Sequence, residues 1–279
     1  MDEACKDSLE KKILLEPLLY SELTTINLDN ENFNLLDLIY LSRAAYNSTE
    51  SKLDLEGIQI SKLNLDTYKY YYISSTKTSF YTIETNYNKF LIIVFCGSNT
   101  LTDWIYNLYP NKEFPDTLSN TLLENVPDKY KFKLEHGWYI KFKSIQSILD
   151  KIINSHTGKI ILTGHSLGAA LALISSIYYC SKVQNQLCVI GFAMPNIGNE
   201  YLIDYCNQFI NYIRVVDRSD IISGGRGDRY LNSKSIIIDL DKGFTYNLWN
   251  IRYHLCNNYI NKIKCLLDNY NIIEKYELS

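Results

Sequence analysis

The sequence lacks the cysteine spacing that marks a disulfide-linked or zinc-binding protein. Its seven cysteines are scattered along 279 residues, and no two of them form a C-x-x-C pair. An odd number of irregularly spaced cysteines argues against both a disulfide framework and a zinc site. We therefore expect buried free thiols in a reducing compartment, and no metal or cofactor.

An excess of basic residues is also missing. The chain has 28 lysines and arginines against 31 aspartates and glutamates, which gives a net charge of −3. A nucleic-acid-binding protein needs a positive surface, so we expect no nucleic-acid partner. The N-terminal stretch MDEACKDSLEKK is acidic and polar, unlike a secretory signal. The most apolar long run, residues 160–179, contains glycine, serine and histidine, so we expect no membrane span and an intracellular, cytoplasmic protein.

Internal repeats and long Pro-, Gly- or Ser-rich linkers are absent as well. We divide the chain into an N-terminal extension, residues 1–30, with one helix near 8–20, and a single domain, residues 31–279. Apolar residues at helical spacing predict helices over 33–46 and 137–155. The second of these should bury Trp138, Phe142, Ile145, Leu149 and Ile152.

The remaining apolar runs predict an α/β fold. Runs typical of strands occur at 68–73, 79–85 and 89–95, and turn residues at 86–88 predict that the last two form a hairpin. Further along, strands at 159–163, 187–193, 212–216 and 235–239 alternate with helices at 167–181, 199–208 and 256–268. This order predicts a mainly parallel sheet covered on both faces, after a first half rich in hairpins.

The segment KIILTGHSLGAA, residues 159–170, places Ser166 between two glycines where an apolar strand turns into a helix. A sharp turn of this kind projects the hydroxyl away from the sheet, where a base can remove its proton during nucleophilic attack. Gly164 and Gly168 leave room for the strained backbone, and the N–H of Leu167 at the helix start can face developing negative charge. The alternative is a glycine-rich loop that only tightens the turn.

A nucleophilic serine at such a turn needs an acid and then a histidine later in the chain. Of the four histidines, His254 alone follows the strands of the second half, so it is the candidate base by elimination. His165 lies within the turn itself, where we expect it to pack or to hydrogen-bond locally. His136 precedes a helix and His156 ends one.

The segment YIRVVDRSDII offers two candidates for the acid. Asp217 ends the predicted strand directly, and Asp220 lies three residues into the following loop. A side chain in that loop can turn back over the sheet edge, so spacing alone leaves the two candidates nearly equal.

These segments together resemble the class 3 lipases, an α/β-hydrolase family, over most of residues 33–260. The stretches that carry the likeness are IVFCGSNTLTDW (93–104), EHGWY (135–139), TGHSLGAALA (163–172), GFAMPNIGN (191–199) and RVVDRSDII (214–222). The resemblance implies an α/β-hydrolase fold, with a mostly parallel central sheet flanked by helices on both faces.

The resemblance also implies roles for particular residues. It favours Asp220 over Asp217, because the last aspartate of RVVDRSDII looks like the family's catalytic acid. It implies that the backbone N–H of Ser98 joins that of Leu167 in an oxyanion hole. Two departures are visible: Cys96 stands where the family usually has arginine, and Ser223 stands where a proline normally follows the acid.

The sequence thus predicts a serine hydrolase that cleaves carboxylic esters of lipids, acylglycerols or phospholipids, through an acyl-enzyme. A small-ester esterase or thioesterase of the same fold and a catalytically silent lipase-like interaction protein are the alternatives. The amphipathic segment 101–109 is either a lid over the site or a helix packed in the core. Contact with a lipid surface would arise through the substrate, and the oligomeric state stays open.

Overall fold

The computed structural model describes residues 34–86, 90–98, 134, 136–180, 182–183, 187–217, 219–220, 222–223, 235–238 and 253–265. The predicted extension over residues 1–30, with its helix near 8–20, lies outside the described residues. The amphipathic segment 101–109 lies outside them too, so its interpretation as a lid or as a core helix stays a prediction.

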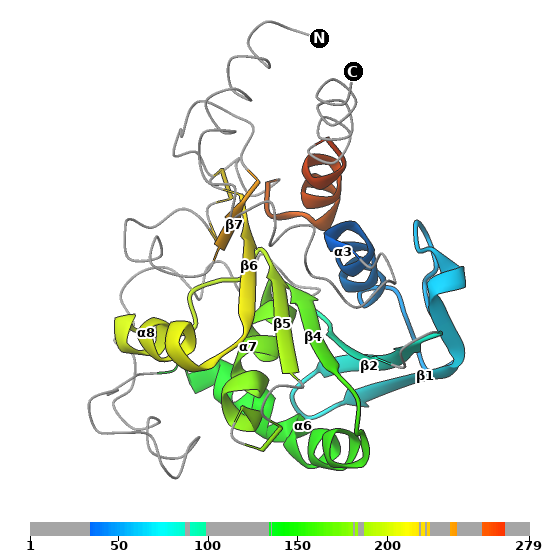
Figure 1. Ribbon diagram of the computed structural model, residues 1–279, viewed down its shortest axis with the longest axis horizontal. Coiled ribbons are helices and arrows are strands. Elements are labelled where there is room, and N and C mark those ends of the chain that lie inside the picture. The colour runs from blue at the N-terminus through cyan, green and yellow to red at the C-terminus, as the bar shows by residue number, and fades with distance from the viewer. Residues whose placement is uncertain are drawn as a thin grey trace, which may run out of the picture.

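Seven strands form one sheet in the order β1-β2-β3-β4-β5-β6-β7 (Figure 1). The strands are β1 (Leu63–Ile73), β2 (Thr78–Thr85), β3 (Leu91–Phe95), β4 (Ile160–His165), β5 (Leu187–Phe192), β6 (Tyr212–Val216) and β7 (Ser235–Ile237). Pairing is antiparallel from β1 to β3 and parallel from β3 to β7. The predicted hairpin and the parallel second half are therefore confirmed.

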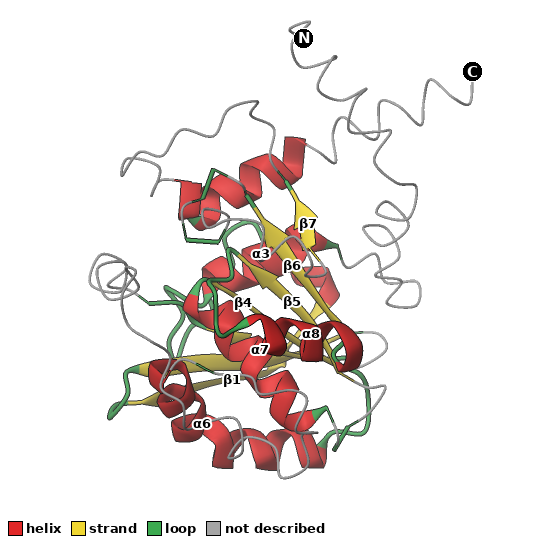
Figure 2. Cartoon of the chain, turned by 90° about the vertical axis from the view of Figure 1, so that its left-hand side faces the viewer, coloured by secondary structure: helices red, strands yellow, loops and turns green. Residues whose placement is uncertain are grey.

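Helices cover both faces of this sheet. They are α3 (Leu35–Ala44), α6 (His136–Ser155), α7 (Leu167–Tyr179), α8 (Glu200–Phe209) and a helical segment over residues 256–265. The short 3-10 helix η1 (Ile60–Lys62) precedes β1 and buries no residue. Figure 1 shows α3 and the segment 256–265 on one side of the sheet, and Figure 2 shows α6, α7 and α8 in front of the other side. Within the described part of the chain, no helix is both long enough and apolar enough to cross a membrane.

The strands alternate their side chains between two apolar clusters, one on each face. In β3, Ile93 and Phe95 join the cluster with α6 and α7, whereas Ile92 and Val94 join the cluster with α3. This alternation has the period of two that a strand imposes, and both faces are apolar because both are covered. The cysteines in the described residues are free, and each is buried or half-buried.

One detail of helix α6 differs from the sequence prediction. Ile153 is fully buried, whereas Ile152, the predicted inward residue, is only partly buried at the edge of the cluster. Both spacings from Leu149, three and four residues, fit one helix face, because a turn takes about 3.6 residues. In the last turn of α6, the residue four positions after Leu149, which is Ile153, faces the core.

Hydrogen bonds fix helix α3 against the sheet. The side chain of Asn34 accepts from the backbone N–H groups of Leu36 and Asp37 at the start of the helix. The hydroxyl of Tyr81 on β2 donates to the carbonyl oxygen of Leu41 over 2.8 Å. The Asn34 bonds cap the helix itself, whereas the Tyr81 bond ties α3 to strand β2.

Candidate active site

The parallel register brings three strand ends to one edge of the sheet. Phe95 at the end of β3 pairs with Gly164 on β4, and His165 pairs with Phe192 at the end of β5. Phe192 in turn pairs with Val215 on β6. The segments that follow these strands therefore emerge side by side at the carboxyl edge, where open α/β sheets bind their ligands.

Ser166 lies in the sharp turn between β4 and α7. Its backbone has φ 58° and ψ −123°, a conformation that non-glycine residues rarely adopt and that costs about 1–3 kcal/mol. The N–H of Ser166 donates to the carbonyl oxygen of Phe192 over 2.9 Å, which holds the strained residue against the end of β5.

The two glycines that flank Ser166 are required by close backbone contacts. A Cβ at Gly168 would lie 2.1 Å from the carbonyl oxygen of Phe95. A Cβ at Gly164 would lie 2.5 Å from the carbonyl carbon of Gly168. The two glycines therefore allow the start of α7 to pack directly against the end of β3, which a glycine-rich loop that only tightened the turn would not require.

Hydrogen bonds join Ser166, His254 and Asp220. His254 Nδ1 lies 2.8 Å from Asp220 Oδ2, and His254 Nε2 lies 2.8 Å from Ser166 Oγ. An ionised carboxylate only accepts, so Nδ1 carries the proton and donates it, which leaves Nε2 to accept from the serine hydroxyl. The side chains of His254 and Asp220 are fully buried, and Ser166 is 6% exposed.

The two candidate acids have different partners although both are fully buried. Asp220 faces His254, whereas Asp217 forms a salt bridge with Lys262 over 2.8 Å and accepts from Asn258 Nδ2 over 2.8 Å. The loop after β6 therefore turns Asp220, and not Asp217, toward the histidine, and this geometry favours Asp220 as the candidate acid.

The surroundings of Asp220 favour its ionised form. Burial by itself would raise the pKa of this carboxyl, but the facing His254 and hydrogen bonds from His254, Ser223 and the N–H of Ile222 hold the pKa below its ordinary value. The carboxylate is therefore charged at neutral pH, as an acceptor that orients a histidine must be.

His165 is buried and packs against neighbouring rings, as one of the two expectations had it, but its hydrogen bonds reach distant residues and not local ones. Its Nε2 lies 2.6 Å from the backbone carbonyl oxygen of His254, and its Nδ1 lies 2.8 Å from the hydroxyl of Tyr46. A carbonyl oxygen only accepts, so Nε2 donates and Nδ1 accepts from Tyr46. Burial and the neighbouring His254 lower the pKa of His165 to about 3, so the ring stays neutral.

The predicted oxyanion-hole residues lie on neighbouring segments. Leu167 begins α7, so its N–H is among the first-turn donors that have no acceptor within the helix. Ser98 is half-buried and follows shortly after β3. A Cβ at Gly97 would lie 1.9 Å from the hydroxyl oxygen of Tyr46 and 2.9 Å from the carbonyl oxygen of His165, so this segment runs directly beside the turn that carries Ser166.

Sequence reasoning missed two hydroxyl groups that contact the acid. Ser223 Oγ donates to Asp220 Oδ2 over 2.7 Å, and the Tyr259 hydroxyl donates to the same oxygen over 2.8 Å. The sequence signal for Ser223 was its place where the lipase resemblance leads one to expect proline. Tyr259 had no such signal, because it is one of 24 tyrosines in the chain.

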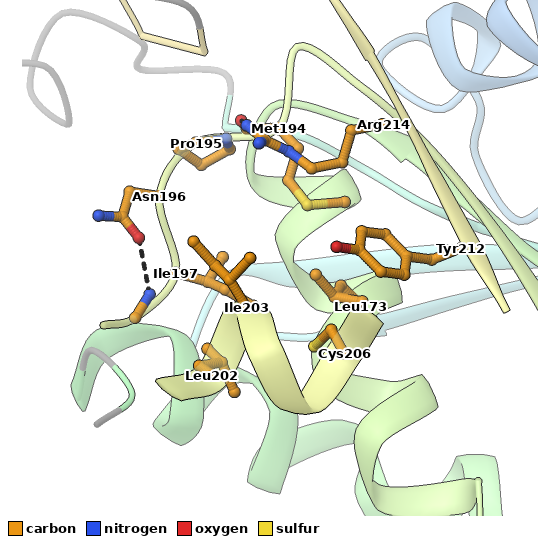
Figure 3. A pocket seen from close by; sticks show the side chains of 11 residues that line it. Leu173, Met194, Pro195, Asn196, Ile197, Leu202, Ile203, Cys206, Tyr212 and Arg214 are labelled. Atoms are coloured by element: carbon orange, nitrogen blue, oxygen red, sulfur yellow. Dashed lines mark hydrogen bonds between the residues drawn. The ribbon is translucent and has the colours of Figure 1, made fainter. Parts of the chain in front are cut away.

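A small apolar pocket lies beside α8 (Figure 3). Leu173, Met194 and Cys206 are among the residues that line it, and Arg214 lines one end. The guanidinium of Arg214 is buried and donates to the carbonyl oxygen of Met194 over 3.0 Å. This contact ties the segment after β5 to strand β6.

Most of the residues of this site lie in a segment that matches a known protein family. The family model Lipase (class 3) matches residues 92–225, a range that contains Ser98, Ser166, Leu167 and Asp220. This segment of the chain is therefore similar to the class 3 lipases. His254 lies beyond the lipase match, and the hydrogen bond to Asp220 brings it to this segment.

Two curated lipases are similar to part of the chain. Phospholipase A1-Igamma3 of Arabidopsis thaliana is 26% identical over 153 residues, which cover 47% of this chain and 29% of that protein. The lipase of Rhizomucor miehei is 24% identical over 140 residues, which cover 48% of this chain and 37% of that protein. The alignments thus span well under half the length of each curated relative.

Solved lipase structures share the fold. The lipase of Rhizopus microsporus var. chinensis superimposes with a TM-score of 0.54 and 19% identity, over 76% of this chain and 70% of that one. The mono- and diacylglycerol lipase of Aspergillus oryzae gives a TM-score of 0.54 and 20% identity, over 67% of this chain and 71% of that one. At this level of identity the likeness shows the fold alone, and the chain has the α/β-hydrolase fold.

Proposed function

We propose that the chain is a serine hydrolase that cleaves carboxylic esters of lipids through an acyl-enzyme on Ser166. One observation carries the proposal: hydrogen bonds run without interruption from Ser166 Oγ through the His254 ring to Asp220, at 2.8 Å each. The strained backbone of Ser166 adds support, because strain of this kind gathers at functional sites.

In the proposed reaction, Ser166 Oγ attacks the ester carbonyl carbon while His254 Nε2 takes its proton. Asp220 keeps the proton of His254 on Nδ1 and stabilises the imidazolium that forms. The tetrahedral intermediate collapses as Nε2 returns the proton to the leaving alcohol. Water then attacks the acyl-enzyme with the same base and releases the carboxylic acid, so the enzyme returns to its starting state.

The backbone N–H groups of Leu167 and Ser98 would stabilise the oxyanion of the intermediate. The first-turn position of Leu167 and the packing of Gly97 beside His165 support this assignment. Removing one donor from such a pair usually costs about 3 kcal/mol of transition-state stabilisation.

The assignment of a lipid substrate rests on the relatives. They are described as a phospholipase A1, a lipase, and a mono- and diacylglycerol lipase. All three names describe proteins that act on lipid esters, which supports a lipid ester as the substrate class for this chain. Contact with a lipid surface would then come through the substrate.

A fluorophosphonate probe tests the nucleophile directly. We expect the wild-type protein to be labelled at Ser166, and Ser166→Ala to lose both the label and esterase activity. Ser175→Ala is the matched control: this serine is fully buried in α7, and its Oγ has no hydrogen-bond partner in the described part of the chain. Full activity in Ser166→Ala, or an unlabelled but folded wild type, would reject the proposal.

A chain-length series of p-nitrophenyl esters tests the substrate class. A lipid hydrolase should give its highest kcat/KM with long acyl chains, because the apolar contacts that bind the chain grow with its length. An optimum at acetate or butyrate would instead identify a small-ester esterase with the same triad.

A further inference from the structure

Asp220 Oδ2 has three donors, which is more than orienting a histidine requires. Besides His254 Nδ1, it accepts from Ser223 Oγ over 2.7 Å and from the hydroxyl of Tyr259 over 2.8 Å. The second oxygen, Oδ1, accepts from the N–H of Ile222 over 2.9 Å. The acid of the proposed triad is therefore held by both of its oxygens and from two segments of the chain.

The protons in this cluster can be assigned from the acceptors. The Tyr259 hydroxyl accepts from the N–H of Asp217 over 3.2 Å, so its own proton is available for Asp220. Burial and the charge of Asp220 raise the pKa of Tyr259 well above its ordinary value, so it keeps this proton. Ser223 Oγ also lies 2.9 Å from the Tyr259 hydroxyl, which places the two donors side by side on one oxygen.

The backbone of Ser223 is anchored independently of its hydroxyl. The buried guanidinium of Arg214 donates to the carbonyl oxygen of Ser223 over 3.4 Å and to that of Met194 over 3.0 Å. Figure 3 shows the Arg214 side chain next to Met194. Ser223 is itself 4% exposed, so its hydroxyl has no competing bond to bulk water.

We propose that Ser223 is a positioning residue of the triad, whose hydroxyl holds the carboxylate of Asp220 in the charge state and orientation that His254 needs. The inference rests on the proposed function, because it concerns the same triad. Proline, which the lipase resemblance leads one to expect here, has no side-chain donor. In this chain the serine therefore supplies a hydrogen bond that proline at this position would not.

The proposal predicts a change in pH dependence when the hydroxyl is lost. A carboxylate that loses a donor becomes more basic, because hydrogen bonds favour its charged form. It then attracts the imidazole proton more strongly, so the base stays protonated up to a higher pH. The groups that face this cluster are His165 from β4, Arg214 and Asp217 from β6 and its end, and Tyr259 and Lys262 from the segment 256–265.

The experiment compares full-length wild type, Ser223→Ala, Ser223→Thr and the control Ser175→Ala by the pH profile of kcat/KM on a p-nitrophenyl ester. We expect the acid limb of Ser223→Ala to move to higher pH by roughly 0.5–1 unit, which is less than the roughly 1–2 units that a whole charged hydrogen bond is worth, because the lost bond acts on His254 only through Asp220. Ser223→Thr keeps the hydroxyl and should restore the wild-type limb. Ser175→Ala should leave it unmoved.

Two results separate this inference from the proposed function. A wild type that fluorophosphonate labels, with an acid limb unchanged in Ser223→Ala, overturns the role of Ser223 and leaves the hydrolase intact. An unlabelled wild type rejects the hydrolase instead. In that case the NMR resonance of the His254 Nδ1 proton still tests the role of Ser223. This resonance should move downfield in Ser223→Ala, because the more basic carboxylate accepts the proton more strongly, and an unmoved resonance overturns the inference.

A second variant keeps the test decisive if Ser223→Ala does not fold. Ser223→Cys preserves the size of the side chain and retains only a weak donor. We expect it to move the acid limb in the same direction by a smaller amount. A folded Ser223→Cys protein with the wild-type limb and the wild-type proton resonance overturns the inference.

Discussion

His165 holds the backbone of His254: its Nε2 donates to the carbonyl oxygen of that residue over 2.6 Å. The residue that precedes the proposed nucleophile in the sequence thus fixes the main chain of the proposed base. The two rings lie with their centroids 4.9 Å apart. Ser166 and His254 are therefore positioned relative to each other by a contact that is separate from the hydrogen bond between their side chains.

The neutral state of His165 makes the protein sensitive to acid. The pKa of His165 is about 3 in the folded chain, below the ordinary value of 6.5, so between these values the unfolded chain binds more protons. Stability should therefore be complete above pH 6.5 and fall as the pH drops toward 3. Urea unfolding of wild type and His165→Gln at pH 7 and pH 4.5 measures this, and the variant should lose less stability between the two. Equal losses would contradict the neutral, buried ring.

The bond between Tyr46 and His165 should show as an energetic coupling. Tyr46→Phe removes the donor to His165 Nδ1 and leaves a buried acceptor unpaired, which should cost about 1–3 kcal/mol of unfolding free energy. In His165→Gln the same tyrosine substitution should cost less, because the ring acceptor is already gone. A double-mutant cycle measured by urea unfolding gives the coupling, and purely additive effects would exclude it.

Substitution of Asp220 should lower activity, whereas substitution of Asp217 should lower stability. Asp220→Asn should lower kcat by about 10⁴-fold, because the amide no longer fixes the proton of His254 on Nδ1. Asp217→Asn leaves Lys262 with a broken ion pair and should cost about 3 kcal/mol of stability. The folded fraction of Asp217→Asn should keep most of the wild-type kcat. The reverse pattern would assign the acid to Asp217.

Gly168 should tolerate no side chain. A Cβ there would lie 2.1 Å from the carbonyl oxygen of Phe95 and 2.8 Å from its carbonyl carbon, and neither backbone atom can move aside easily. We expect Gly168→Ala to lower the unfolding free energy by more than about 3 kcal/mol, at the severe end for point mutations. Ala172→Gly, a buried site in the same helix, should cost only about 1 kcal/mol. Similar values for the two variants would contradict the close contact.

The sequence alone predicted those features of the fold that depend on the local pattern of apolar and turn residues. The strand at 212–216 was predicted with its observed bounds, because an apolar run between polar residues marks it on both sides. The hairpin of β2 and β3 followed from turn residues between two apolar runs. Ser166 and His254 followed from motif and chain order, and the structure brings them together.

Features that depend on long-range packing could not be predicted in the same way. Asp217 and Asp220 are both buried at the end of β6, and spacing along the chain did not distinguish them. The lipase resemblance favoured Asp220, and the course of the following loop turns that residue toward His254. The partners of His165 lie 119 and 89 residues away in the sequence, which no local pattern indicates. The division at residue 30, the lid at 101–109, the catalytic roles of the triad residues, the oxyanion roles of Ser98 and Leu167, and the cytoplasmic location stay predictions.

The missing side chain at Gly168 has a mechanical consequence. Because the start of α7 touches the last carbonyl group of β3, the turn that carries Ser166 and the strand that leads to Ser98 cannot slide past each other. The spacing between Ser166, the proposed nucleophile, and this strand end is therefore fixed when the chain folds, before any substrate binds. Whatever adjustment an incoming substrate induces must take place on the other sides of the serine.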